Sequence, residues 1–199
     1  MSAQPARTLE PRPICAHPVS SQDDLDAALA LNQIPVCEHD SAIFTVGNEA
    51  TVVARGSCHI VATGDARVVA GGRVEVRASE GAFIWAGDDA TVKASGSSRV
   101  LASGHSRVHS RGSSTVLASE ETSIAADDRS IVIARDQAHV IALGRSRVVA
   151  HDYAEVEAYD RALVRADGRA HVIAHNASIV EAGASVETIA LDAAVIAHI

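Results

Sequence analysis

The sequence predicts an all-β solenoid in which an eight-residue unit repeats over residues 42–199. Three observations predict this fold: Val or Ile recurs every eight residues, Ala follows it by two residues, and Gly, Asp or Asn closes most units. Apolar residues at every second position share one face of a strand. Gly, Asp and Asn tolerate a positive φ and can turn the chain after each short strand. The unit is therefore small-x-[Val/Ile]-x-Ala-x-[Gly/Asp]-x, wound as a coil.

The Val/Ile row has no gap between residues 52 and 180, and Phe44 extends it toward the N-terminus. Its members are Val52, Ile60, Val68, Val76, Ile84, Val92, Val100, Val108, Val116, Ile124, Val132, Val140, Val148, Val156, Val164, Val172 and Val180. The Ala row deviates at Ser110, and the row of small residues deviates at Val74. A helix is a poor alternative, because a Gly or Asp in every unit disfavours it. We expect the Val/Ile and Ala side chains to point inward.

Two octads per coil are favoured by the residue that follows each Val or Ile, because alternate octads differ in character. One series is apolar before it ends in two charged residues: Val53, Val69, Trp85, Leu101, Leu117, Ile133, Val149, Arg165 and Glu181. The other series is mixed: Val61, Arg77, Lys93, His109, Ala125, Ile141, Glu157, Ile173 and Ile189. Three octads per coil would scatter the apolar series over several faces. We therefore expect coils of 16 residues and two facing parallel sheets, with about nine coils in a rod roughly 40 Å long.

The N-terminal region does not follow the repeat. Residues 1–20 are rich in Pro and are expected to form a flexible arm. Residues 21–41 are expected to form a cap with a short helix over 22–31, begun by Ser20 or Ser21. We expect this helix to cover the first coil, because an uncovered sheet edge can pair with other chains.

The C-terminal segment stays in register with the repeat and ends at Ile199, without a polar finish. Terminal repeats of solenoids usually carry a polar cap. We therefore expect this end either to contact another chain, through Ile196 and Ile199, or to continue into a further domain.

Composition limits the compartment and the partners. Hydrophobic residues make up 47% of the chain but aromatic residues only 3%, which predicts a thin core of small side chains. The net charge of −8 argues against a nucleic-acid partner. The chain has no long apolar run and no signal-peptide core, so we expect no membrane partner and a place in the cytoplasm or in a phage particle. Of its three Cys, Cys58 occupies an inward position, and a contact between Cys15 and Cys37 is left open.

No catalytic, cofactor-binding or metal-binding motif is present, and we expect no enzyme activity, no cofactor and no metal. His139 and His171 are expected on one face but two coils apart, which is too far to share an ion. His151 and His175 are expected on opposite faces. The Asp-rich turns also lack the nine-residue period of calcium-binding β-rolls.

Octads such as SRVLASGH, STVLASEE, AHVIALGR and AEVEAYDR resemble the Ala/Val octapeptide repeats (A-x-V-x-A-x-G-x) of uncharacterised β-solenoid proteins from actinobacteria and phages. The resemblance covers about residues 42–199. It implies a β-solenoid with a structural or tail-associated role, and it carries over no catalytic residue. Bactofilins are similar only in architecture.

The leading hypothesis is a non-enzymatic scaffold that associates with itself, or with another protein, through an apolar sheet face. The expected interface residues are Val53, Val69, Phe83, Trp85, Leu101, Leu117, Ile131, Ile133 and Val149, with Leu163 on the same sheet. One alternative is an inhibitor rod that mimics DNA, although residues 51–199 hold eighteen acidic and fifteen basic residues, too balanced for a phosphate mimic. A second alternative is a passive spacer attached to an effector domain.

Overall fold

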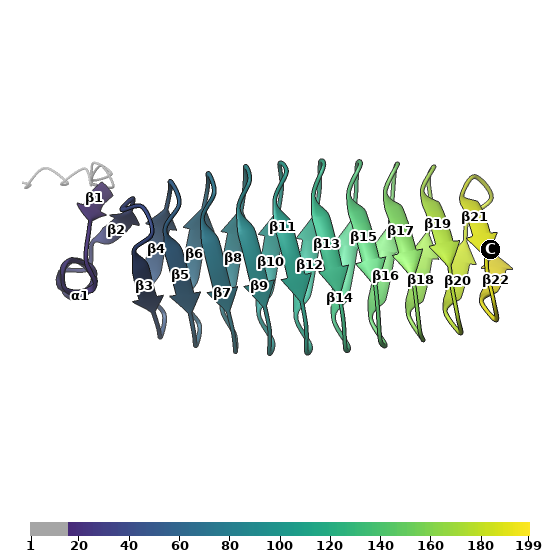
Figure 1. Ribbon diagram of the computed structural model, residues 1–199, viewed down its shortest axis with the longest axis horizontal. Helices are drawn as coiled ribbons and strands as arrows, with labels where there is room; N and C mark the ends of the chain where they lie inside the picture. The colour runs from purple at the N-terminus through teal and green to yellow at the C-terminus, as the bar shows by residue number, and fades with distance from the viewer. Residues whose placement is uncertain (1–15) are drawn as a thin grey trace, which may run out of the picture.

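The structure is a computed structural model that describes residues 16–199, and it is a rod of stacked coils (Figure 1). The chain alternates between two parallel sheets, one of 12 strands (sheet A) and one of 10 strands (sheet B). Sheet A contains β1 (Ala16–Val19), β2 (Ile34–Cys37), β4 (Thr51–Ala54), β6 (Arg67–Ala70), β8 (Phe83–Ala86), β10 (Arg99–Ala102), β12 (Thr115–Ala118), β14 (Ile131–Ala134), β16 (Arg147–Ala150), β18 (Leu163–Ala166), β20 (Ile179–Ala182) and β22 (Val195–His198). Sheet B contains β3 (Ile43–Val46), β5 (His59–Ala62), β7 (Glu75–Ala78), β9 (Thr91–Ala94), β11 (Arg107–Ser110), β13 (Ser123–Ala126), β15 (His139–Ala142), β17 (Glu155–Ala158), β19 (His171–Ala174) and β21 (Glu187–Ala190).

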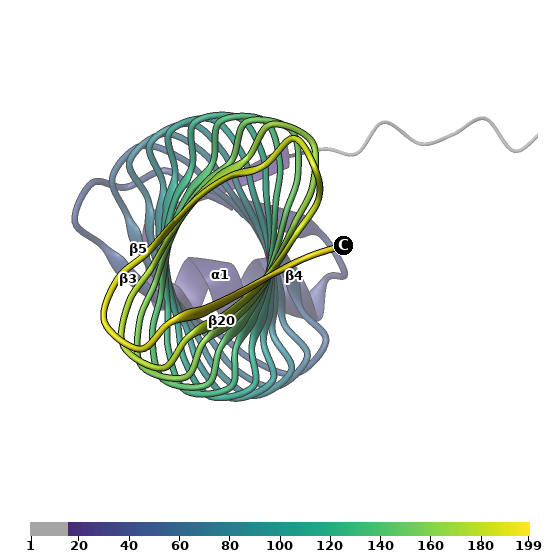
Figure 2. The ribbon, with the colours of Figure 1, turned by 90° about the vertical axis from the view of Figure 1, so that its right-hand side faces the viewer.

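The predicted coil of 16 residues is confirmed by the strand register. From β3 onward each strand pairs in parallel with the strand one coil away, so that Val100 lies beside Val116 and Leu101 beside Leu117. Seen along the rod, the coils superpose as flattened loops, with one sheet on each long side (Figure 2).

The core between the sheets consists of the predicted inward rows. Every Val or Ile of the row from Val52 to Val180 is buried, and the Ala row is buried beside it, with Ala102 only 3% exposed. Ser or Thr replaces Ala at several inward positions in the middle of the rod, and these side chains are also buried. The hydroxyls of Ser130 and Ser146 have no hydrogen-bond partner among the described residues.

Most turns of the repeat contain a residue in the left-handed region, usually Gly, Asp or Asn as the pattern predicts, and Glu in two of them. Gly72 has a φ of 71°, and a Cβ there would lie 3.1 Å from the carbonyl oxygen of Gly56. Where Asp or Glu takes this position, its carboxylate in most cases accepts a hydrogen bond from the backbone N–H one coil earlier. Asp88 accepts from Gly72 at 2.8 Å, and Glu80 accepts from Gly64 at 2.9 Å. Several turn carboxylates therefore accept hydrogen bonds from the neighbouring turn and are not free surface charges.

The N-terminal end is covered by α1 (Gln22–Ala30), which lies across the far end of the coil in Figure 2. Of the two predicted caps it is Ser21 that begins the helix, since its side chain accepts from the N–H of Asp24. Leu25, a residue of α1 itself, is completely buried.

One expectation for this end needs correction, because residues 16–19 do not belong to an arm. They form β1, which pairs in parallel with β2, and Val19 is buried there. Pro18 lacks an N–H, but an edge strand tolerates that loss. The remainder of the arm expected over residues 1–20, residues 1–15, lies outside the described residues.

At the C-terminal end, β21 and β22 continue both sheets, but their inward residues are partly uncovered. Over residues 16–199, no helix is both long enough and apolar enough to cross a membrane.

Candidate functional site

The apolar series forms one continuous row on the outer face of sheet A. Strands β4 to β16 place its members in direct register, each beside the next. We call this row the apolar file: Val53, Val69, Trp85, Leu101, Leu117, Ile133 and Val149. Trp85 is 39% exposed and Leu117 is 44% exposed. The file ends where Val149 lies beside Arg165.

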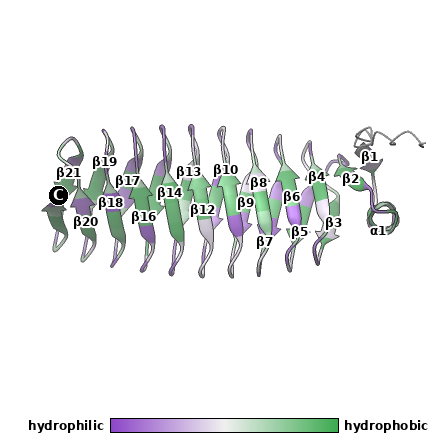
Figure 3. Ribbon diagram, turned by 180° about the vertical axis from the view of Figure 1, so that it is seen from behind, coloured by the Kyte–Doolittle hydropathy of each residue, from purple (hydrophilic) through white to green (hydrophobic). Residues whose placement is uncertain are grey.

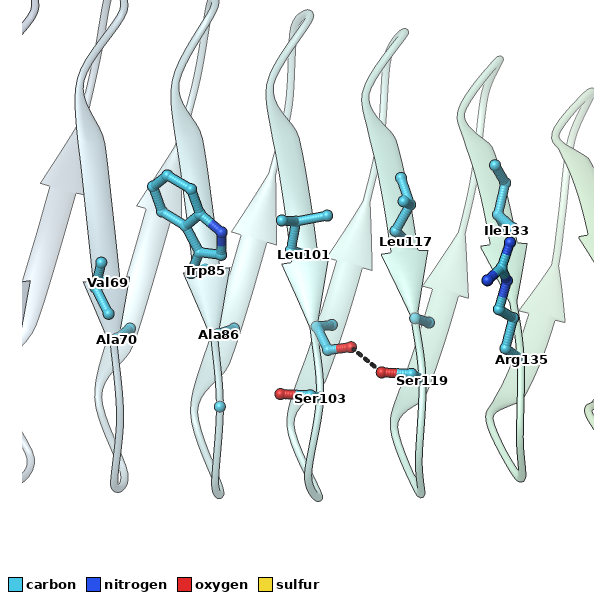
Figure 4. A pocket seen from close by; sticks show the side chains of 13 residues that line it. Val69, Ala70, Trp85, Ala86, Leu101, Ser103, Leu117, Ser119, Ile133 and Arg135 are labelled. Carbon is cyan, nitrogen blue, oxygen red and sulfur yellow. Dashed lines mark hydrogen bonds between the residues drawn. The ribbon is translucent and has the colours of Figure 1, made fainter.

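A shallow groove of roughly 500 Å³ runs beside the apolar file (Figure 4). The file from Val69 to Ile133 forms one wall, and the Ala residue that ends each strand lines the floor. Gly87, Ser103 and Ser119 lie along the other side, and Arg135 lies beside Ile133 at one end. Sheet A thus presents an apolar ridge directly beside a groove lined mostly by small residues, which we call the apolar groove.

The predicted aromatic anchors lie together on β8. Phe83 and Trp85 occupy successive outward positions, with ring centroids 4.4 Å apart in an edge-to-face arrangement. Phe83 belongs to a second outward row, in which basic residues are interspersed among apolar residues and one Thr. The row runs through Arg67, Phe83, Arg99, Thr115, Ile131, Arg147 and Leu163. Figure 3, in which the ribbon colour includes the buried residues, shows hydrophobic stretches on β10, β14 and β16 with hydrophilic segments between them.

Histidines are distributed as the sequence predicts. His139 and His171 lie in one row with Glu155 between them, and so are two coils apart. Over residues 16–199, no group of three or more His, Cys, Asp or Glu could hold a metal ion.

Histidine–carboxylate pairs between neighbouring coils are a feature that sequence reasoning missed. Nδ1 of His151 lies 2.6 Å from Oδ1 of Asp167, and Nε2 of His105 lies 3.2 Å from Oε2 of Glu121. The spacing in the sequence could have predicted both pairs, because the two members of each pair are separated by the 16 residues of one coil.

Cys37 and Cys58 are free thiols in the core. Burial raises the pKa of Cys37 to about 12 and also raises the pKa of Cys58. Sγ of Cys58 donates to the carbonyl oxygen of Cys37 at 3.4 Å. The contact between Cys15 and Cys37 that the sequence left open is not tested, because Cys15 lies outside the described residues. Because a thiol must ionise to act as a nucleophile, the two buried thiols are poorly suited to chemistry.

The two predicted end-contact residues lie at the last coil. Ile196 is partly buried against the core, whereas Ile199 is 65% exposed. Their role in an end-to-end contact stays a prediction.

Comparisons of the chain with protein-family models, with curated proteins and with solved structures found no match. The surfaces of the two sheets are therefore the features of the molecule that point to a function.

Proposed function

We propose that this protein is a non-enzymatic structural scaffold that forms a homodimer through the outer face of sheet A. The observation that supports the proposal is the apolar file. Single exposed apolar residues are common on protein surfaces, but large contiguous apolar patches mark interaction sites. Here seven apolar residues lie side by side on seven neighbouring strands of sheet A.

A second copy is the partner that best fits the shape of this face. The ridge and the apolar groove lie side by side, so a two-fold axis parallel to the rod would place the ridge of each protomer in the groove of the other. Two sheets can pack in this way at about 10 Å.

The charges favour the same arrangement of parallel rods. Arg67, Arg99 and Arg147 lie in the outward row on the side of the file away from the groove. A two-fold axis parallel to the rod turns Arg67 and Arg99 toward Gly71 and Ser103 of the second copy, and Arg135 of that same row lies at the level of Ile131 rather than of another Arg. Antiparallel rods would instead bring the two Arg-bearing rows together, which like-charge repulsion disfavours.

The outer face of sheet A is large enough for a stable dimer interface if the turns beside the strands also contact the second copy. Seven strands at about 4.8 Å and four residues at about 3.3 Å cover about 34 by 13 Å, or about 440 Å². A standard interface buries about 800 Å² per partner. The strands thus provide about half of this area, and the turns on either side would provide the rest.

The test is the mass in solution, by light scattering at high micromolar concentration. We expect the wild type to be a dimer and the double variant Leu101→Glu, Leu117→Glu to be a monomer with an unchanged β circular dichroism spectrum, because two carboxylates per chain would enter a dry interface. The control is Thr45→Glu, Val61→Glu, which places two carboxylates on adjacent strands of the outer face of sheet B, beside Arg77 rather than beside a native carboxylate, and should stay dimeric. A monomeric wild type would refute the proposal.

The origin in actinobacteria or phages, the place in the cytoplasm or in a phage particle, and an end-to-end contact through Ile196 and Ile199 are part of the same proposal. The DNA-mimic alternative is less favoured, because carboxylates such as that of Asp88 already accept backbone N–H groups. Together with the near balance of charge in the repeat, this leaves few carboxylates to imitate a row of phosphates.

A further inference from the structure

A second groove, of roughly 410 Å³, lies on sheet B at the same place in the coil as the apolar groove on sheet A. Arg77, Lys93 and His109 form its wall in direct register on β7, β9 and β11. Arg111 and two Ser residues also line it, and no acidic side chain is among the lining residues. We call this the basic groove.

The cations of the basic groove are not neutralised by their surroundings. Over residues 16–199, neither Arg77 nor Lys93 forms a salt bridge, and Arg111 has only Asp127 at 4.0 Å. Arg77 and Lys93 lie directly opposite each other on paired strands, an arrangement that destabilises a sheet when the charges are alike. A protein with a net charge of −8 thus concentrates unpaired positive charge in one groove. An anion bound there would relieve the repulsion.

The arrangement of these side chains favours a linear ligand with several charges. The cationic positions follow one another along the rod at the strand spacing of about 4.8 Å, so a single carboxylate could neutralise only one or two of them. The guanidinium of Arg77 can hold phosphate oxygens through two parallel N–H donors, and Lys93 adds a point charge. The volume lies within the range of small-molecule sites, about 300–1,000 Å³.

We propose that the basic groove binds a linear oligophosphate, of the length of a triphosphate group, along the rod axis. The group has two sources, a free inorganic oligophosphate or the phosphate chain of a nucleotide. The site lies on the sheet opposite the apolar file, so the inference stands independently of the proposed dimer.

The test is calorimetric titration with sodium triphosphate at physiological ionic strength. We expect one site per chain and binding at least tenfold weaker in the double variant Arg77→Gln, Lys93→Gln. The control is Arg67→Gln, Arg99→Gln, which removes the same charge from the outer face of sheet A and should change the affinity less than twofold. All four side chains are exposed, so both variants should keep the wild-type circular dichroism spectrum.

Titration with ATP separates the two sources. Binding of ATP at least tenfold tighter than triphosphate assigns the group to a nucleotide, and equal or weaker binding assigns it to a free oligophosphate. The proposal is overturned by no binding of either probe, by equal weakening in both double variants, or by orthophosphate binding as tightly as triphosphate. It is also overturned if the change at Arg77 and Lys93 alters the mass of the protein but not its triphosphate binding, because the groove would then hold a second copy.

Discussion

The two grooves occupy the same place on the coil, one on each sheet, yet their walls have opposite character. Trp85 and Leu101 line one, whereas Lys93 and His109 line the other. Beneath both walls lie the same inward rows of Val/Ile and Ala. The difference shows that the inward pattern of this solenoid sets the fold, while one outward residue per coil sets the chemistry of a face.

The largest effect should come from the core that the two faces share. Ala102 on β10 and Ala94 on β9 are both buried. A change of either to Leu would overpack a thin core, and each should destabilise the protein by about 1–3 kcal/mol or more. Urea denaturation followed by circular dichroism measures this. An outward change such as Leu101→Ala should lower the free energy of unfolding far less. If Ala94→Leu were as stable as the wild type, the cores beneath sheet A and sheet B would not be packed alike.

The contrast between the faces can be tested by exchange. Changing Trp85 to Arg and Leu101 to Lys gives the apolar groove a cationic wall like that formed by Arg77 and Lys93. We expect loss of the dimer by light scattering and a rise from one to two triphosphate sites per chain by calorimetry. A variant that still binds one triphosphate would show that the backbone of sheet A does not form an equivalent site.

A smaller effect is expected at the turns. Asp88 combines a φ of 52° with the hydrogen bond from the N–H of Gly72. Asp88→Ala loses the bond and keeps the strained φ, and should cost about 1–2 kcal/mol. Asp88→Asn should retain most of the stability, and Asp88→Gly should fall between them because Gly removes only the strain. Thermal unfolding ranks the three, and equal stability of the Ala and Asn variants would argue against the hydrogen bond.

The smallest effect concerns the buried hydroxyls. The Ser130 hydroxyl has no partner among the described residues, whereas the Ser178 hydroxyl donates to the carbonyl oxygen of His175 at 2.7 Å. We expect Ser130→Ala to be neutral or stabilising, and Ser178→Ala to cost about 1 kcal/mol. Denaturation midpoints of the two variants measure the difference. A loss at Ser130 equal to that at Ser178 would indicate a partner for the first hydroxyl.

The regular part of the fold was predictable because one pattern is repeated without a gap. The row from Val52 to Val180 identified the strands, and the segregation of the outward residues identified two octads per coil. Strand β1 was not predictable, because Ala16–Val19 lies outside the repeat and, among the described strands, pairs only with β2.

The candidate sites were predictable in part. The apolar file follows from the 16-residue spacing alone. The grooves do not, because they depend on how the chain bends after each Ala. The ligand of an exposed face also depends on a molecule that the chain does not contain, so the sequence could suggest the surface but not its occupant.

The register of the coils has a consequence for evolution. Within the repeat, the strands of each coil hydrogen-bond only to those of the coils directly before and after it, as in other repeat proteins whose units interact only with their neighbours. Removal of residues 131–146 would join Ser130 to Arg147 and leave every remaining coil with an equivalent neighbour. The length of the rod can therefore change by whole coils without redesign of the core, and each duplication or deletion lengthens or shortens both faces by one step. A rod of this kind can therefore fix the distance between its two ends in steps of one coil.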